Sequence, residues 1–112
     1  MNTQYIDNLP MEWEPIARIF AALGDKYRQT IMLLFEPGEV ISLKTIVDII
    51  PLSRSAVVHH VTTLQYAGLI TPIKRGREVY YQPNIALFFQ AIEIVKEYTK
   101  PLLVEQLNQL KK

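Results

Sequence analysis

The sequence has no cysteine and only two histidines in 112 residues. Without cysteine there is no disulfide bond, no thiolate nucleophile and no thiolate metal site. No window approaches the ~20 uninterrupted apolar residues of a membrane-spanning helix. The amino-terminal segment lacks the basic start and apolar run of a secretory signal. We therefore expect a cytoplasmic protein that holds no metal and no cofactor.

Residues that could carry catalysis are equally scarce. No histidine has an adjacent carboxylate, and no glycine loop has the pattern of a phosphate-binding site. His59 and His60 are neighbours on an expected helix, where successive side chains point about 100° apart, so the two rings do not face one another. We expect neither a metal site at this pair nor enzymatic activity.

Length and composition indicate one domain spanning residues 1–112. A hydrophobic content of 49% is ample for a core and argues against disorder. The net charge is only +1, but residues 1–25 carry four acids and one base, a balance of −3. Residues 53–82 carry four bases and one acid, a balance of +3. Positive charge is therefore collected in the second half of the chain.

The first half of the chain shows helical periodicity. The apolar residues of 16–23, Phe20 included, predict one buried face of a helix that begins at Pro15 and ends at Gly24. Asp25 is the expected N-cap of a second helix, which runs until a Pro-Gly pair breaks it.

A close helix pair is expected next. Ser42 is the predicted N-cap of a third helix, and the turn at residues 51–53 is so short that the third and fourth helices must pack at an angle. In the fourth helix Val57, Val61 and Leu64 share the buried face. The residues left pointing outward are Arg54, Ser55, Val58, His59 and Thr62.

β-branched and aromatic residues then predict an antiparallel hairpin over residues 70–81, with its turn at Arg75-Gly76. Pro72 restricts its strand to a sheet edge.

A long apolar stripe predicts the last helix. Asn84 is its expected N-cap, the stripe covers residues 85–98, and Pro101 should kink or divide the helix.

This order of elements is that of a winged helix-turn-helix, a mainly α fold with a small β-hairpin wing. Its second helix enters the DNA major groove, where short polar side chains can reach base edges, and its wing grips the flanking phosphates. We expect double-stranded DNA as the partner, with His60 at the helix edge donating to a phosphate. The predicted DNA-binding residues are Ser53, Arg54, Ser55, Val58, His59, His60, Thr62, Lys74, Arg75, Gly76 and Arg77.

Several motifs resemble the ArsR/SmtB-type family of bacterial winged helix-turn-helix transcriptional regulators, over roughly residues 14–105. They are Leu23-Gly24-Asp25 with Arg28, then Val58-His59-His60-Val61, Ala67-Gly68-Leu69 and Gly76-Arg77. The family's usual serine and leucine in the recognition helix are replaced here by Val58 and Val61.

The resemblance implies a homodimer formed by the first and last helices, which places two recognition helices one DNA turn apart on an inverted repeat, as in a repressor. The dimerisation residues expected are Trp13, Ile16, Phe20, Leu87, Phe88, Ile92, Ile94, Val95, Tyr98 and Leu103. Metal-sensing members carry a Cys-x-Cys where Ser42 and Lys44 stand here, and no histidine follows His60. We therefore expect neither metal nor cysteine sensing.

The alternative is a winged-helix protein-protein interaction module. Such a surface normally exposes a larger apolar cluster, whereas Val58 is the one apolar residue on the predicted outward face.

Overall fold

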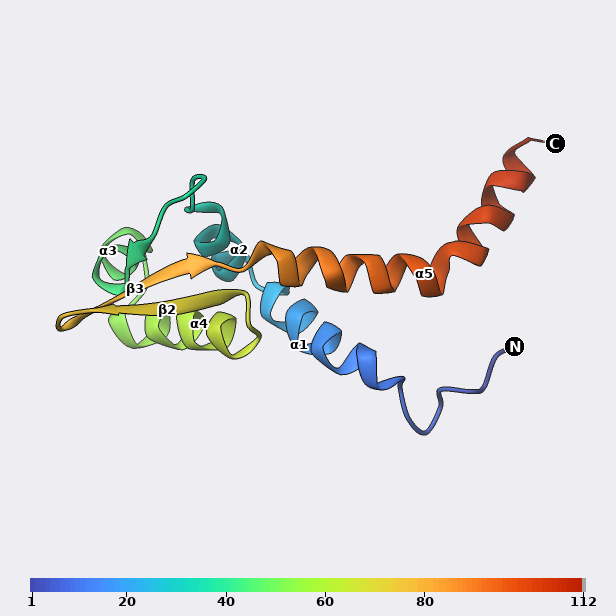
Figure 1. Ribbon diagram of the computed structural model, residues 1–112, viewed down its shortest axis with the longest axis horizontal. Helices are drawn as coiled ribbons and strands as arrows, with labels where there is room; N and C mark the ends of the chain where they lie inside the picture. Colours follow the sequence, from blue (N-terminus) through green and yellow to red (C-terminus); the bar gives the residue numbers. More distant parts are fainter. Residues whose placement is uncertain (112) are drawn as a thin grey trace.

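The computed structural model describes residues 1–111, which form helices around a three-stranded sheet. The helices are α1 (Glu14–Leu23, after a 3-10 turn at Met11–Trp13), α2 (Lys26–Leu33), α3 (Leu43–Ile49), α4 (Arg54–Tyr66) and α5 (Ile85–Leu110). The strands are β1 (Ile41–Ser42), β2 (Ile70–Arg75) and β3 (Glu78–Pro83). Figure 1 shows α3, α4 and the sheet at one end of an elongated molecule, from which α1 and α5 extend toward the other end. The predicted mainly α fold with a hairpin wing is confirmed.

Short polar side chains begin three of the helices. Asp25 Oδ1 accepts hydrogen bonds from the backbone N–H of Tyr27 (2.8 Å) and of Arg28 (3.2 Å), and Ser42 Oγ accepts one from Thr45 (3.0 Å). Both predicted N-caps are therefore confirmed. Ser53 Oγ accepts from the N–H of Ala56 at the start of α4. Asn84 holds the N-cap position of α5, but its side chain makes no capping hydrogen bond within residues 1–111.

The core lies where α1, α2, α3 and α4 meet the sheet. Ile19, Ile31, Ile46, Val57 and Leu64 are fully buried there. The interior also takes in Ile16, which is only 1% exposed. Its prediction as a dimerisation residue is wrong, because the core of its own chain already covers it. Conversely Phe20, expected on the buried face of α1, is 43% exposed.

The sheet has the order β1-β3-β2, so Pro72 lies in an edge strand as predicted. The hairpin closes through Gly76 and Arg77, with Arg75 paired to Glu78. Gly76, the first central residue of the turn, has a φ of 64°, whereas Arg77, the second, has a negative φ, because only glycines have a positive φ among the described residues. This pair of signs is that of a type II′ turn. Strand β1, which was not predicted, pairs with β3 through Ile41 and Ser42.

A glycine ends α4 in the left-handed conformation. Gly68 has a φ of 83°, and a Cβ built there would lie 2.8 Å from Leu87 Cδ2. We expect Gly68→Ala to lower the free energy of unfolding by about 1–2 kcal/mol, because a left-handed φ is unfavourable for alanine and the side chain of Leu87 must move. Urea unfolding checks this. Gly24→Ala is the matched control, since Gly24 has a negative φ and nothing closer than 3.4 Å; equal losses would contradict the prediction.

The last helix changes direction in its final third. Figure 1 shows the bend toward the carboxyl end of α5, and Pro101 lies inside this helix. Proline removes one backbone hydrogen bond and its ring clashes with the preceding turn, so the predicted kink is confirmed. Among residues 1–111 no helix is both long and apolar enough to cross a membrane.

Candidate nucleic-acid interface

The outward face of α4 carries no acidic residue. Arg54, Ser55, His59 and Thr62 are exposed, and Val58 is half-buried. Within residues 1–111 the side chains of Arg54, His59 and Thr62 make no hydrogen bond and no ion pair, whereas Thr63 Oγ1 donates to the carbonyl of His59 (2.9 Å). The face therefore presents unpaired donors and acceptors, which is what reading of base edges requires.

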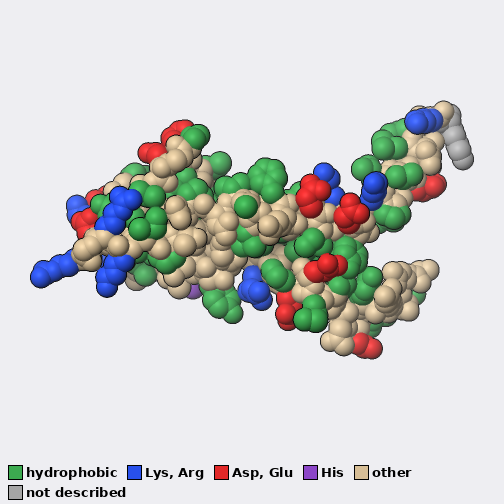
Figure 2. Space-filling view, viewed as in Figure 1, with side chains coloured by type: hydrophobic (Ala, Val, Ile, Leu, Met, Phe, Trp, Pro, Cys, Tyr) green, Lys and Arg blue, Asp and Glu red, His purple; other side chains and the backbone are tan. Residues whose placement is uncertain are grey.

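The wing ends in a cluster of cations. Lys74, Arg75, Gly76 and Arg77 are all exposed. Figure 2 shows blue side chains projecting from this end of the molecule. The guanidinium of Arg75 lies 5.1 Å from the ring centroid of Tyr80. This contact holds one cation beside the hairpin turn.

Glu78 is the single acid at the wing, and it is engaged by tyrosine. Tyr80 Oη donates to Glu78 Oε2 (2.9 Å). This hydrogen bond and the charge of Glu78 raise the pKa of Tyr80 above its ordinary value. No ion pair ties Glu78 to a wing cation within residues 1–111, so the cluster retains its positive charge.

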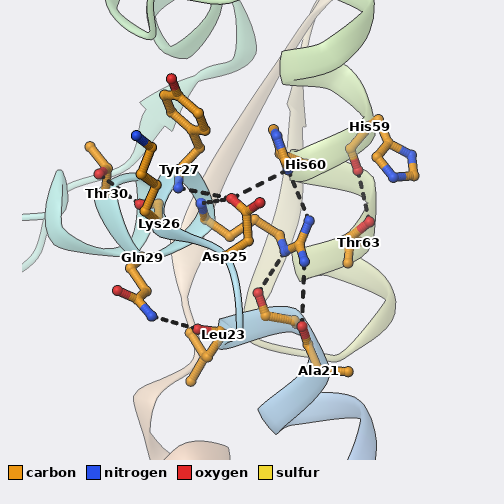
Figure 3. A network of polar contacts seen from close by, with 12 residues as sticks. Ala21, Leu23, Asp25, Lys26, Tyr27, Gln29, Thr30, His59, His60 and Thr63 are labelled. Carbon is orange, nitrogen blue, oxygen red and sulfur yellow. Dashed lines mark hydrogen bonds and ion pairs between the residues drawn. The ribbon is translucent and has the colours of Figure 1, made fainter.

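His60 faces the protein interior. Figure 3 shows its ring directed toward the junction of α1 and α2, where Arg28 Nη1 donates to His60 Nδ1 (2.9 Å). Asp25 Oδ1 lies 4.0 Å from the same nitrogen, and the His60 side chain is only 14% exposed. Nδ1 is thus engaged within the chain, so the predicted contact of His60 with a phosphate would have to be made through Nε2.

Arg28 connects three helices. Besides His60 on α4, it donates through Nε to the carbonyl of Ala22 (2.6 Å) and through Nη2 to that of Ala21 (3.3 Å), both at the end of α1. The last carbonyls of a helix have no partner inside the helix, and a cation there also complements the helix dipole. Arg28 thus fixes α4 relative to α1.

The carboxyl of Asp25 stays ionised in this network. Desolvation alone would raise its pKa, but hydrogen bonds from the backbone N–H groups of Arg28 and Tyr27, with the charge of the Arg28 guanidinium, lower the pKa below its ordinary value. Because the pKa of Asp25 is lower in the folded chain than in the unfolded chain, the ionised Asp25 cap contributes its full stability at a pH above the unfolded-state pKa. That contribution is lost as the pH falls through the folded pKa.

Removal of Arg28 tests this junction. We expect Arg28→Ala to lower the free energy of unfolding by about 1–3 kcal/mol, because His60 and the two α1 carbonyls lose a charged donor. Chemical denaturation at fixed protein concentration measures the change. Arg18→Ala removes the same charge from an exposed side chain of α1 that has no partner within residues 1–111, and it should be nearly neutral. Equal losses in the two variants would contradict a special role for Arg28.

The predicted dimerisation residues lie in two environments. Trp13, Leu87, Phe88, Ile94 and Val95 are partly buried against the core of their own chain. Those with open apolar surface are Phe20, Ile92, Tyr98 and Leu103.

Three further exposed apolar residues of α5 were not among the predicted dimerisation residues. Ile85 is 43% exposed, Phe89 61% and Leu107 47%, and they lie on the same face of the helix as Ile92 and Leu103, whereas Tyr98 lies on the opposite side. The signal was present in the periodicity of α5, which carries two apolar faces, one toward the core and one toward solvent.

Metal-ligating side chains do not gather anywhere in the described part of the chain. No group of three or more His, Asp or Glu residues there could hold a metal ion. The positions of Ser42 and Lys44 agree with this, because Ser42 Oγ donates to Thr45 Oγ1 (2.8 Å) and Lys44 pairs loosely with Asp48 (3.9 Å).

Solved structures share this architecture. An ArsR-like transcriptional regulator from Rhodococcus sp. RHA1 is 27% identical, with a TM-score of 0.72 over 88% of this chain and 92% of that one. HlyU from Vibrio cholerae N16961 is 18% identical, with a TM-score of 0.62 over 80% and 97%. NolR from Sinorhizobium fredii is 18% identical, with a TM-score of 0.56 over 80% and 85%. No family model matches the sequence, and no curated protein matches it.

Proposed function

We propose that this chain is a homodimeric, sequence-specific DNA-binding regulator. It has the winged helix-turn-helix fold of the ArsR-type transcriptional regulators, and it resembles these proteins rather than any enzyme. It acts in the cytoplasm as a repressor that occupies an inverted-repeat operator. The observation that carries the proposal is the shared position of two surfaces at one end of the molecule. One is the acid-free outward face of α4, and the other is the cationic tip of the wing.

The two surfaces divide the work of recognition. Ser55, His59 and Thr62 of α4 hydrogen-bond to base edges in the major groove, and Val58 lies on a thymine methyl. Lys74, Arg75 and Arg77 neutralise phosphates, and Gly76 lets the hairpin backbone approach them closely. Ser53 and Arg54 stand at the amino end of α4, where backbone N–H groups also favour a phosphate. His60 holds α4 against Arg28 through Nδ1, so any contact it makes with a phosphate is made through Nε2.

Dimerisation doubles both contacts. The exposed apolar face of α5, together with Phe20 of α1, is surface that a chain of this size does not cover by itself. Joining two copies through it gives a two-fold axis, and a two-fold protein matches an inverted repeat. Because the chain has no cysteine and no histidine after His60, we infer that it senses neither cysteine oxidation nor a metal ion.

The test is selection of genomic fragments with the purified chain, followed by titration of the enriched duplex at two salt concentrations. We expect an inverted repeat with half-sites about one helical turn apart and an affinity that falls steeply with salt. A duplex with one half-site scrambled is the matched control and should bind much more weakly.

Two results would contradict the proposal. If no sequence is enriched and binding is weak on every duplex, the chain does not act as an operator-binding protein. A stoichiometric protein partner recovered without DNA would instead favour the protein-interaction module.

A further inference from the structure

An aromatic hollow lies where the amino-terminal segment meets α5, far from the wing. The rings of Trp13 and Tyr98 are 5.4 Å apart between centroids at 87°, and those of Tyr5 and Tyr98 are 6.2 Å apart at 67°. Together with Leu9 and Pro10 these three rings line a hollow of about 250 Å³. Tyr98 therefore forms a wall that stands nearly perpendicular to the other two rings.

Carboxylates surround the other side of Tyr98. A second hollow of about 180 Å³ is lined by Tyr98, Ile94 and the acids Glu12, Glu93 and Glu97. Lys96 pairs with Glu93 (3.2 Å), whereas no ion pair engages Glu12 or Glu97 within the described residues. The aromatic hollow thus opens beside uncompensated negative charge.

Tyr98 and Glu12 join the two hollows. Tyr98 Oη donates a hydrogen bond to Glu12 Oε1. This bond, with desolvation and the charge of Glu12, raises the pKa of Tyr98 to about 12. The hydrogen bond therefore places the Glu12 carboxylate beside the Tyr98 ring.

Trp13 is incompletely satisfied by its own chain. Its indole N–H is buried, and it has no hydrogen-bond partner within residues 1–111. Unpaired buried donors are uncommon in folded proteins. A partner for this donor would have to be a hydrogen-bond acceptor from outside residues 1–111, and an ammonium group is not an acceptor.

We propose that this hollow binds a small organic cation of the quaternary ammonium class. Aromatic faces attract such cations through their quadrupole, and quaternary ammonium groups are recognised by rings arranged as walls of this kind. The acids Glu12 and Glu97 supply the complementary charge. A neutral ligand of the same shape lacks both attractions and binds more weakly.

The site is placed to control the proposed function. Trp13 immediately precedes α1 and Tyr98 lies on α5, so a bound cation bears on the two helices that form the proposed dimer. Occupancy of the hollow therefore changes the angle between α1 and α5 and, through it, the affinity for DNA. This last step rests on the proposed function, whereas binding of the cation does not.

Fluorescence of the full chain tests the binding directly, because Trp13 is its only tryptophan. Choline chloride is titrated at constant ionic strength against sodium chloride, and 3,3-dimethyl-1-butanol serves as the neutral isostere. We expect a saturable change with choline and about tenfold weaker binding of the isostere, in line with the strength of a partly desolvated cation-π contact. Equal binding of the two ligands, or no response to choline, would overturn the proposal; in the second case a partner chain fills the hollow.

Variants separate the ring from its hydroxyl. Tyr98→Leu should abolish the choline response, whereas Tyr98→Phe keeps the ring and should retain most of it. Tyr66→Leu removes an exposed tyrosine from α4, away from the hollow, and should leave the response unchanged. Loss in Tyr98→Phe as well would show that the hydroxyl and not the ring face matters, which contradicts the cation-π basis.

The operator titration repeated with choline tests the regulatory step. A shifted DNA affinity in the wild type that is absent in Tyr98→Leu is the expected result. If choline binds but no operator is found, the proposed function is wrong and the cation site stands. If an operator is bound but choline has no effect on the chain, the cation site is wrong and the proposed function stands.

Discussion

Replacing Arg75 and Arg77 together by alanine is expected to weaken operator binding on the order of a hundredfold at about 0.15 M salt. The two side chains are exposed at the wing tip, and a dimer presents four of them. Each phosphate contact on duplex DNA contributes about 0.9 to the slope of log affinity against log salt concentration, so the slope should fall by up to about 3.6. Titrations of the labelled operator at several salt concentrations measure both quantities.

The wing variant has a charge-matched control. Lys100→Ala/Lys111→Ala removes the same charge from exposed side chains of the far end of the molecule. If the wing grips phosphates, the control retains nearly the full salt slope. The loss in the wing variant should also be similar on operator and on random duplex, because phosphate contacts carry no sequence information. Unchanged affinity and slope in the wing variant would refute a phosphate-gripping wing.

Phe89→Asp is expected to convert the proposed dimer into monomers and to abolish operator binding. Phe89 is 61% exposed on the outward face of α5, so its loss removes little from the core of its own chain. A carboxylate buried at an apolar interface without a partner costs several kcal/mol, which two-fold symmetry imposes twice. Sedimentation equilibrium should show the mass fall from twice 13.0 kDa to 13.0 kDa.

An exposed aromatic residue away from α5 provides the comparison. Tyr66, at the end of α4, is 79% exposed, and Tyr66→Asp should leave the mass unchanged. Urea unfolding of Phe89→Asp must show a folded monomer for the result to count. A Phe89→Asp variant that remains dimeric would place the interface on a different surface.

Much of the fold could be predicted because its signals are local. A helix cap needs one side chain and the next two or three N–H groups, so Asp25 and Ser42 are recognisable from neighbouring residues. The hairpin turn is likewise set by Gly76, and the bend of α5 by Pro101. Strand β1 was not predicted because a strand of two residues is too short to show an alternation of apolar and polar side chains.

The errors concern surfaces and long-range contacts. Periodicity shows that Ile16 and Phe20 share an apolar face, but only packing decides that Ile16 is buried while Phe20 remains open. The inward orientation of the His60 ring depends on Arg28, which is 32 residues away in sequence. The residues next to His60 therefore could not predict this orientation. The predicted base and phosphate contacts of α4 and the wing remain predictions.

The separation of charge along the chain gives the molecule a direction. Bases gather at the wing, whereas the first 25 residues carry a balance of −3 and lie mostly near the opposite end. Such a molecule has an electric dipole, and the electric field of a DNA duplex orients the wing toward the DNA before contact is made. Encounters that begin with the acidic end are repelled, and those that begin with the wing are drawn in. The rate of association should therefore be fast at low ionic strength and should slow markedly once the Debye length, about 8 Å at 0.15 M, becomes short compared with the molecule's 58 Å length.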